Sequence, residues 1–184
     1  MNREPTSPSI AVIGVGNEFR GDDGVGLSIV TCLRGRARRN PLPPGVMLCT
    51  CDGEPARLLS LWEGADIAIV IDAGRTGVPD SVGEVHRFVS DGTLPQPEPD
   101  ATSSHGLGLA AAVELARVLG RLPRILIVYA VEGGEFGLGL GLSPAVSAAV
   151  EPTARRVENE VRKFALATGR AARRRPNTSR DQSP

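Results

Sequence analysis

The stretch that decides the fold runs from residue 10 to residue 29 and reads IAVIGVGNEFRGDDGVGLSI. An apolar run of the length of a buried strand ends at two glycines spaced one residue apart, and a segment with helical spacing follows. A strand, a glycine turn and a helix in this order favour a parallel sheet. The unusual feature of the turn is the acidic pair Asp22 and Asp23, which lies at the start of the expected helix.

Strand-like and helix-like segments alternate along most of the chain. The expected strands are 9–15, 45–51, 65–73, 82–89 and 124–131, and the expected helices are 22–36, 54–62, 105–119 and 143–166. This order predicts an α/β fold in which a twisted, mainly parallel sheet carries helices on both faces, a three-layer α/β/α arrangement. Ligands of such folds bind beyond the carboxyl ends of the strands.

The length of 184 residues suits one domain, which we expect over residues 9–168. A polar, proline-containing leader over residues 1–8 is expected to be flexible, and the Arg-, Asn- and Ser-rich tail over residues 169–184 is expected to be disordered. Aromatic residues make up only 3% of the chain against 41% hydrophobic residues, so the core must be aliphatic.

Charge and cysteine content indicate which partners and which cellular compartment to expect for the protein. A formal net charge of zero gives no indication of nucleic acid or a membrane surface as a partner. The first nine residues lack the apolar segment of a signal peptide, and no apolar run is long enough to span a bilayer. Cys32, Cys49 and Cys51 fit no disulfide framework, so we expect a cytoplasmic protein in which Cys49 and Cys51 are core residues.

A nucleotide-binding turn is the first interpretation of the opening stretch. A dinucleotide fingerprint requires its third glycine three residues after the second, whereas here Gly21 follows Gly16 only after four intervening residues. A P-loop ends in Gly-Lys-Ser/Thr, and this turn ends in Gly-Asp-Asp. A helix N-terminus binds phosphate through its positive dipole and N–H groups, and Asp22 and Asp23 would oppose that field. Charge therefore argues against a nucleotide.

A simpler interpretation of the acidic pair is helix capping, which contributes about 1 kcal/mol for an N-cap Asp. The same segment places Gly24 and Gly26 in the first turns of the expected helix. Each glycine there costs up to about 1 kcal/mol relative to alanine. Small residues at these positions indicate that another backbone or a bulky partner approaches the helix closely.

Two further residues fall at ends of expected elements. Asp72 closes the strand-like run ADIAIVID, where an acid either serves a site or binds loop N–H groups. His105 begins an Ala-rich helix, where it is either a ligand or a turn histidine bonded to a local carbonyl, whereas His86 in an edge strand is expected to be solvated. Together Asp23, Asp72 and His105 form a mixed oxygen and nitrogen set that suits a first-row divalent metal.

At this point the sequence resembles the family of [NiFe]-hydrogenase maturation endopeptidases. The segment VIGVGNEFRGDDGVG (residues 12–26) is similar to the family's opening signature, which reads roughly G-x-G-N, a few residues, then D-[DE]-G-x-G. IVIDAGRTG (69–77) and SSHGLGL (103–109) resemble, in the same order, the segments with the strand-end aspartate and the helix-start histidine. GLGLSPAV (139–146) resembles the stretch before the last helix, so the resemblance extends over about residues 9–166.

The resemblance implies an endopeptidase that removes the C-terminal extension of a [NiFe]-hydrogenase large-subunit precursor after nickel insertion. Asp23, Asp72 and His105 would be both the catalytic residues and the ligands of nickel presented by the precursor, and Zn or Cd could occupy the same site. Hydrolysis would be assisted by the metal or by a carboxylate acting as general base. The implied partner is the precursor, without nucleic acid or membrane.

One loop departs from the family pattern, and two other functions stay open. Where the family has D-G-G-T or a close variant, this chain has Asp52-Gly53-Glu54-Pro55, in a loop that can help to recognise the substrate. The first alternative function is a non-catalytic checkpoint or chaperone that binds the nickel-loaded precursor without cutting it. The second is a metal-dependent hydrolase of small molecules.

Overall fold

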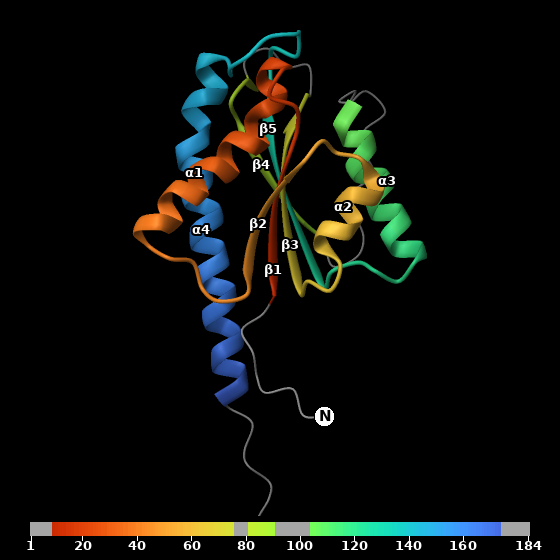
Figure 1. Cartoon of the computed structure of the whole chain (residues 1–184), viewed down its shortest axis with the longest axis vertical. Coiled ribbons are helices and arrows are strands. Elements are labelled where there is room, and N and C mark those ends of the chain that lie inside the picture. The colour runs from red at the N-terminus through yellow and green to blue at the C-terminus, as the bar shows by residue number, and fades with distance from the viewer. Residues whose placement is uncertain (1–8, 76–80, 91–103, 174–184) are drawn as a thin grey trace, which may run out of the picture.

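A computed structural model of the chain describes residues 9–75, 81–90 and 104–173, with side chains at 104–107 and 168–173 left undescribed (Figure 1). The elements follow in the order β1 (Ile10–Val15), the 3-10 turn η1 (Gly21–Gly24), α1 (Val25–Arg39), β2 (Val46–Cys51), α2 (Pro55–Trp62), β3 (Ile67–Gly74), β4 (Val85–Ser90), α3 (Ser104–Val118), β5 (Ile125–Glu132) and α4 (Pro144–Arg173).

The strands of these described ranges form a single five-stranded sheet in the order β2-β1-β3-β5-β4. Strands β2, β1, β3 and β5 run parallel, and only the edge strand β4 is antiparallel to its neighbour β5. Helices α1 and α4 cover one face of the sheet, and α2 and α3 cover the other (Figure 1). This arrangement confirms the predicted three-layer α/β/α fold.

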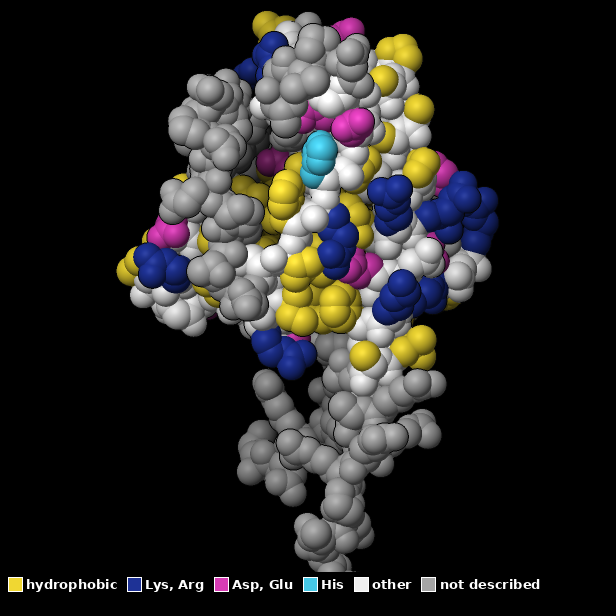
Figure 2. Space-filling view, turned by 180° about the vertical axis from the view of Figure 1, so that it is seen from behind, with side chains coloured by type: hydrophobic (Ala, Val, Ile, Leu, Met, Phe, Trp, Pro, Cys, Tyr) yellow, Lys and Arg dark blue, Asp and Glu magenta, His cyan; other side chains and the backbone are white. Residues whose placement is uncertain are grey.

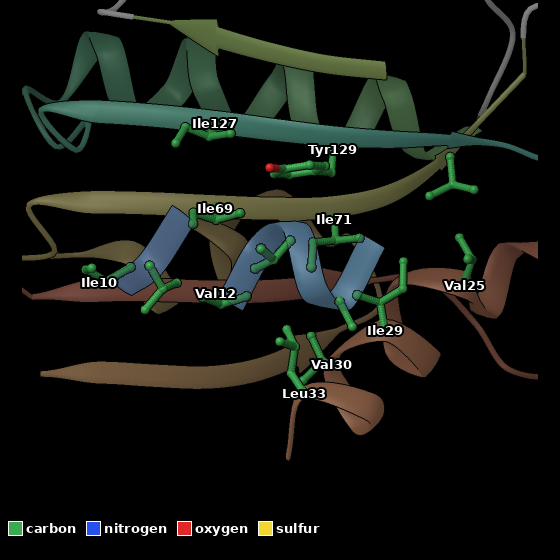
Figure 3. Close-up of a cluster of buried hydrophobic side chains, with 14 of the residues drawn as sticks. Ile10, Val12, Val25, Ile29, Val30, Leu33, Ile69, Ile71, Ile127 and Tyr129 are labelled. Atoms are coloured by element: carbon green, nitrogen blue, oxygen red, sulfur yellow. The ribbon is translucent and has the colours of Figure 1, made fainter. Parts of the chain in front are cut away.

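Alternating side chains of the strands build one aliphatic core on each face. In β3, Ile69 and Ile71 join the cluster formed with α1 and α4, which Figure 3 shows. The intervening residues Ala68 and Val70 belong to the second cluster, under α2 and α3. Because side chains alternate along a strand, Asp72 lies on the α2 and α3 face. The core is aliphatic, as the composition predicted.

Several observed boundaries differ from the predicted ones, and four of these differences concern the candidate site or the end of the predicted domain. Helix α1 begins at Val25, because Asp22 and Asp23 lie in the preceding 3-10 turn η1. Strand β5 includes Glu132, helix α3 begins at Ser104, and helix α4 continues past Leu166 to Arg173. The predicted domain end at residue 168 therefore falls inside α4. The predicted leader and residues 174–184 of the predicted tail lie outside the described residues.

The mixture of basic and acidic side chains on the surface agrees with the formal net charge of zero. Seen from the side opposite to Figure 1, Lys and Arg side chains are interspersed with Asp and Glu side chains (Figure 2). In the described part of the chain, no helix combines the length and the apolarity that a membrane span requires.

Candidate active site

Glycines bring the start of α1 against the sheet. A Cβ atom on Gly26 would lie 2.3 Å from the carbonyl oxygen of Val15 and 2.4 Å from that of Ile71. Both distances are far below van der Waals contact, and both oxygens belong to strand backbone. Helix α1 therefore begins directly against β1 and β3, close to their carboxyl ends. The close backbone approach predicted for the glycines of this helix is confirmed.

Asp22 ties the corner to the connection between β5 and α4. Its side chain is fully buried and accepts hydrogen bonds from the backbone N–H groups of Gly134, Glu135 and Ser143 at 2.9, 2.9 and 2.7 Å. The Ser143 hydroxyl donates a fourth bond at 3.0 Å. Burial raises the pKa of Asp22, but these four donors outweigh it and lower the pKa below its usual value. Asp22 is therefore a structural carboxylate.

Asp23 is oriented differently from its neighbour. It is only 2% exposed, and its Oδ2 atom accepts the backbone N–H of Asn17 at 2.9 Å. The N-cap position of α1 belongs to Gly24, so the capping interpretation of the acidic pair is wrong. The bond to Asn17 holds Asp23 in the turn that follows β1, at the carboxyl edge of the sheet.

Asp72 reaches the same edge from β3. Its side chain is 4% exposed, and Oδ1 accepts the N–H of Ala73 at 2.8 Å. The backbone of the preceding residue, Ile71, lies under Gly26 of α1. The turn that carries Asp23 and the strand end that carries Asp72 are thus brought together by the same glycine contact.

The start of α3 approaches this edge from the other side. A Cβ atom on Gly108 would lie 2.5 Å from the carbonyl oxygen of Gly53, in the loop after β2. The first turns of α3 therefore pack against the carboxyl end of the sheet, and Figure 1 shows η1 and the start of α3 at the same end of the molecule. The side chain of His105 lies outside the described residues, so its contact with the two carboxylates stays a prediction.

No metal site is complete within the described side chains: no three Asp, Glu, His or Cys residues among them are placed to hold one ion. The set predicted from the sequence contains His105, which this finding does not cover. Asp23 and Asp72 supply buried carboxylate oxygens, which suit a hard or borderline divalent cation once a nitrogen ligand is added.

Glu132 is a buried acid that the sequence analysis missed. It is the last residue of β5, 2% exposed, and its neighbour Val131 belongs to the α1 and α4 cluster. Alternation therefore places Glu132 on the same face as Asp72. The signal was present, because RILIVYAVE also ends in an acid, but the predicted strand stopped one residue too early.

His86 differs from its prediction as well. It was expected to be solvated, but it is half-buried, and its Nε2 atom is shielded from water without a hydrogen-bond partner in the described structure. The sheet register aligns Asp72 with Ala130 and Ala130 with His86. Residues paired across strands share a face, so His86 lies on the Asp72 side with the small Ala130 between them.

The loop that departs from the family pattern starts α2. The Glu54 carboxylate accepts the N–H groups of Ala56 and Arg57 at 3.0 and 2.7 Å, and Pro55 is the first helical residue. Glu54 is therefore the N-cap of α2. In the preceding strand, Cys49 and Cys51 pack into the α2 and α3 cluster as predicted, and burial raises the pKa of the Cys51 thiol.

Comparisons with known proteins agree on one family. The family model described as hydrogenase maturation protease matches residues 37–160. The chain is 30% identical over 157 residues to the hydrogenase expression/formation protein HoxM of Azotobacter vinelandii, covering 82% of this chain and 70% of that one. It is 29% identical over 150 residues to the hydrogenase 2 maturation protease of Escherichia coli, covering 80% and 87%.

A solved structure gives the same result. The hydrogenase maturating endopeptidase HybD from Escherichia coli superposes with a TM-score of 0.68 at 27% sequence identity, covering 84% of this chain and 92% of that one. Asp72 and His105 lie inside the range matched by the family model, and Asp23 precedes it. The chain therefore belongs to the hydrogenase maturation protease family and is an endopeptidase.

Proposed function

We propose that this endopeptidase removes the C-terminal extension of a [NiFe]-hydrogenase large-subunit precursor after nickel has been inserted. The observation that carries the proposal is the presence of two buried carboxylates, Asp23 and Asp72, at the carboxyl edge of the sheet in a hydrogenase maturation protease. The start of α3, which carries His105, lies at the same edge.

Nickel belongs to the substrate in this proposal. Cysteine thiolates of the precursor hold it as soft ligands, and Asp23, Asp72 and His105 add oxygen and nitrogen ligands at its remaining positions. The backbone N–H groups of Asn17 and Ala73 fix the orientation of the two carboxylates before the precursor arrives. Such preorganisation lowers the entropy lost when a cation binds.

The same groups explain why cleavage follows nickel insertion. A divalent cation placed between the two buried carboxylates is attracted by both of their negative charges. A precursor without nickel does not supply that attraction and binds weakly. The bound cation can polarise the scissile carbonyl, or a carboxylate can take the proton of the attacking water.

The test compares a nickel-loaded with a nickel-free hydrogenase precursor and measures the mass of the product. We expect clipping of the loaded precursor only. Asp23→Asn, Asp72→Asn and His105→Gln should each lower the cleavage rate at least about 100-fold, the usual effect of removing a catalytic acid or base. Asp66→Asn is the matched control, because Asp66 is exposed at the opposite edge of the sheet and bonds the N–H of Ser9.

Two results would overturn the proposal. Wild-type cleavage rates in all three site variants, with unchanged far-UV circular dichroism, would remove the site assignment. Binding of the loaded precursor by the wild-type protein without any loss of its extension would instead support a non-catalytic checkpoint.

A further inference from the structure

Three large apolar side chains are exposed on two neighbouring loops next to the candidate site. Phe19, in the turn after β1, is 59% exposed, and Leu138 and Leu140, between β5 and α4, are 94% and 76% exposed. We call these three residues the apolar platform. Exposed apolar side chains that gather in one place mark interaction surfaces more often than isolated ones do.

The loops under the platform are fixed by backbone contacts. The N–H of Gly139 donates to the carbonyl of Phe19 at 2.9 Å, and the N–H of Gly21 donates to the carbonyl of Gly139 at 3.0 Å. Arg20 and Gly139 form a parallel bridge. Asp22 anchors both ends of the second loop, at Gly134 and Ser143. The exposed side chains therefore stand on a preorganised frame.

The frame is shared with the candidate site. The N–H of Phe19 donates to Oδ1 of Asn17 at 2.9 Å, and the N–H of Asn17 donates to Oδ2 of Asp23 at 2.9 Å. One turn therefore orients the Asp23 carboxylate and presents the Phe19 side chain.

A groove of about 350 Å³ adjoins the platform. Leu27 of α1 lines it from one side, and Leu140 and Leu142 line it from the other. Gly21 and Gly24 also line the groove, and their lack of side chains lets a partner approach the backbone closely. The lining suits apolar side chains of a partner.

The border of the platform indicates what kind of partner binds. Glu18, Arg20 and Glu135 are exposed beside it, so an apolar centre has a charged rim, as in protein–protein interfaces. The two acidic side chains oppose an anionic membrane surface. An endopeptidase acts on another polypeptide, which must cover the surroundings of the catalytic edge.

We propose that the apolar platform and its groove are the docking surface for the protein substrate, where they bind an apolar patch of the precursor next to the segment that is cut. This inference rests on the proposed function for the identity of the substrate. The platform contributes affinity, and the carboxylates contribute the chemistry. Loss of the platform should therefore change KM and leave kcat nearly unchanged.

The test uses the double variant Leu138→Ser/Leu140→Ser with the nickel-loaded precursor. Both side chains are exposed, so the substitution should leave the fold intact. We expect KM and the Kd of the complex to rise about tenfold or more, because apolar anchors dominate interface affinity. Val118→Ser and Leu166→Ser are matched controls: they are 75% and 69% exposed but lie at the end of α3 and late in α4.

The outcomes separate this inference from the proposed function. Unchanged KM and Kd in the double variant, with cleavage by the wild-type protein, would overturn the docking surface and leave the proposed function standing. Kd is measured from the binding of each protein variant to precursor immobilised on a surface, and this measurement does not require cleavage. Weaker binding in the double variant but not in the controls supports the docking surface even where no clipping is seen, which would refute only the proposed function.

Discussion

Two adjacent aspartates have different surroundings at the scale of single residues. Asp22 is surrounded by N–H and O–H donors from the connection between β5 and α4, whereas Asp23 is held by the N–H of Asn17 within its own turn. The donors to Asp22 stand more than 110 positions away in the chain. The sequence DD shows two acids but cannot show which one those donors reach.

Replacing Asp22 by Asn should destabilise the protein at neutral pH by about 2–4 kcal/mol, because an amide places its own N–H₂ group against donors that need an acceptor. Urea denaturation of the wild-type and variant proteins at pH 7 measures the difference in the free energy of unfolding. Ser60→Ala is a suitable control, because Ser60 lies on the exposed side of α2 and its hydroxyl donates to the carbonyl of Arg57, three residues earlier.

The same substitution should show a defined pH dependence. The pKa of Asp22 is lower in the folded protein than its usual value of 3.8, so the carboxylate stabilises the fold above that pH. The contribution falls as pH drops below about 4 towards the folded-state pKa. The stability difference between the wild-type protein and Asp22→Asn should thus narrow in acid, and a difference that stays constant from pH 7 to pH 3 would contradict this assignment.

At the scale of elements, the position of the start of α1 depends on the absence of a Cβ atom at Gly26. Gly26→Ala should destabilise the protein by about 3 kcal/mol or more, because the new Cβ would meet two strand carbonyls that cannot move independently. Relief of that contact requires α1 to shift away from β1 and β3, which also displaces Asp23. We therefore expect precursor cleavage to fall as well.

The same helix offers the control for this experiment. A Cβ atom on Gly35 would meet nothing within 4 Å, so Gly35→Ala should stabilise the protein by about 0.5–1 kcal/mol through helix propensity and a less flexible unfolded chain. Thermal unfolding of both variants tests the pair. Similar effects of the two substitutions would show that propensity, rather than the contact with the strands, sets the choice of glycine at position 26.

Elements were predictable where a local pattern determines them. The buried run of β3 and the alternation of strands with helices were sufficient for the fold class and for the strand-end position of Asp72. The 3-10 turn η1 was not predicted, because it is stabilised by tertiary contacts such as the bond from the Asp22 N–H to the Glu135 carbonyl. The partial burial of His86 was also missed, because the exposure of a side chain on an edge strand depends on packing with residues far away in the sequence.

At the scale of the whole molecule, the sheet joins the two aliphatic cores. In β1, Val12 belongs to the cluster with α1 and α4, and the next residue, Ile13, belongs to the cluster with α2 and α3. The two cores therefore share the same strands, so we expect them to unfold together. The candidate site uses both layers, because Asp23 precedes α1 and His105 begins α3.

Trp62 provides a probe of this coupling. It is the single tryptophan of the sequence, fully buried in α2, and reports on the α2 and α3 core. Its emission should be blue-shifted in the folded protein, and urea transitions followed by fluorescence and by far-UV circular dichroism should coincide. Leu33→Ala, in the opposite core, should lower the fluorescence midpoint about as much as Leu58→Ala, since each removes a buried leucine at a cost of about 2–5 kcal/mol.

The Leu33 variant is the decisive one, because Leu33 lies in α1 and belongs to the cluster on the far side of the sheet from Trp62. If the two layers unfold as one unit, damage to either core lowers the stability of both, and Trp62 senses the loss of Leu33. If the α2 and α3 layer unfolds separately, the fluorescence midpoint stays at its wild-type value while the circular dichroism midpoint falls. In that case the start of α3 could leave the carboxyl edge while Asp23 and Asp72 stayed in place, and the three predicted ligands would not form a site held by one rigid frame.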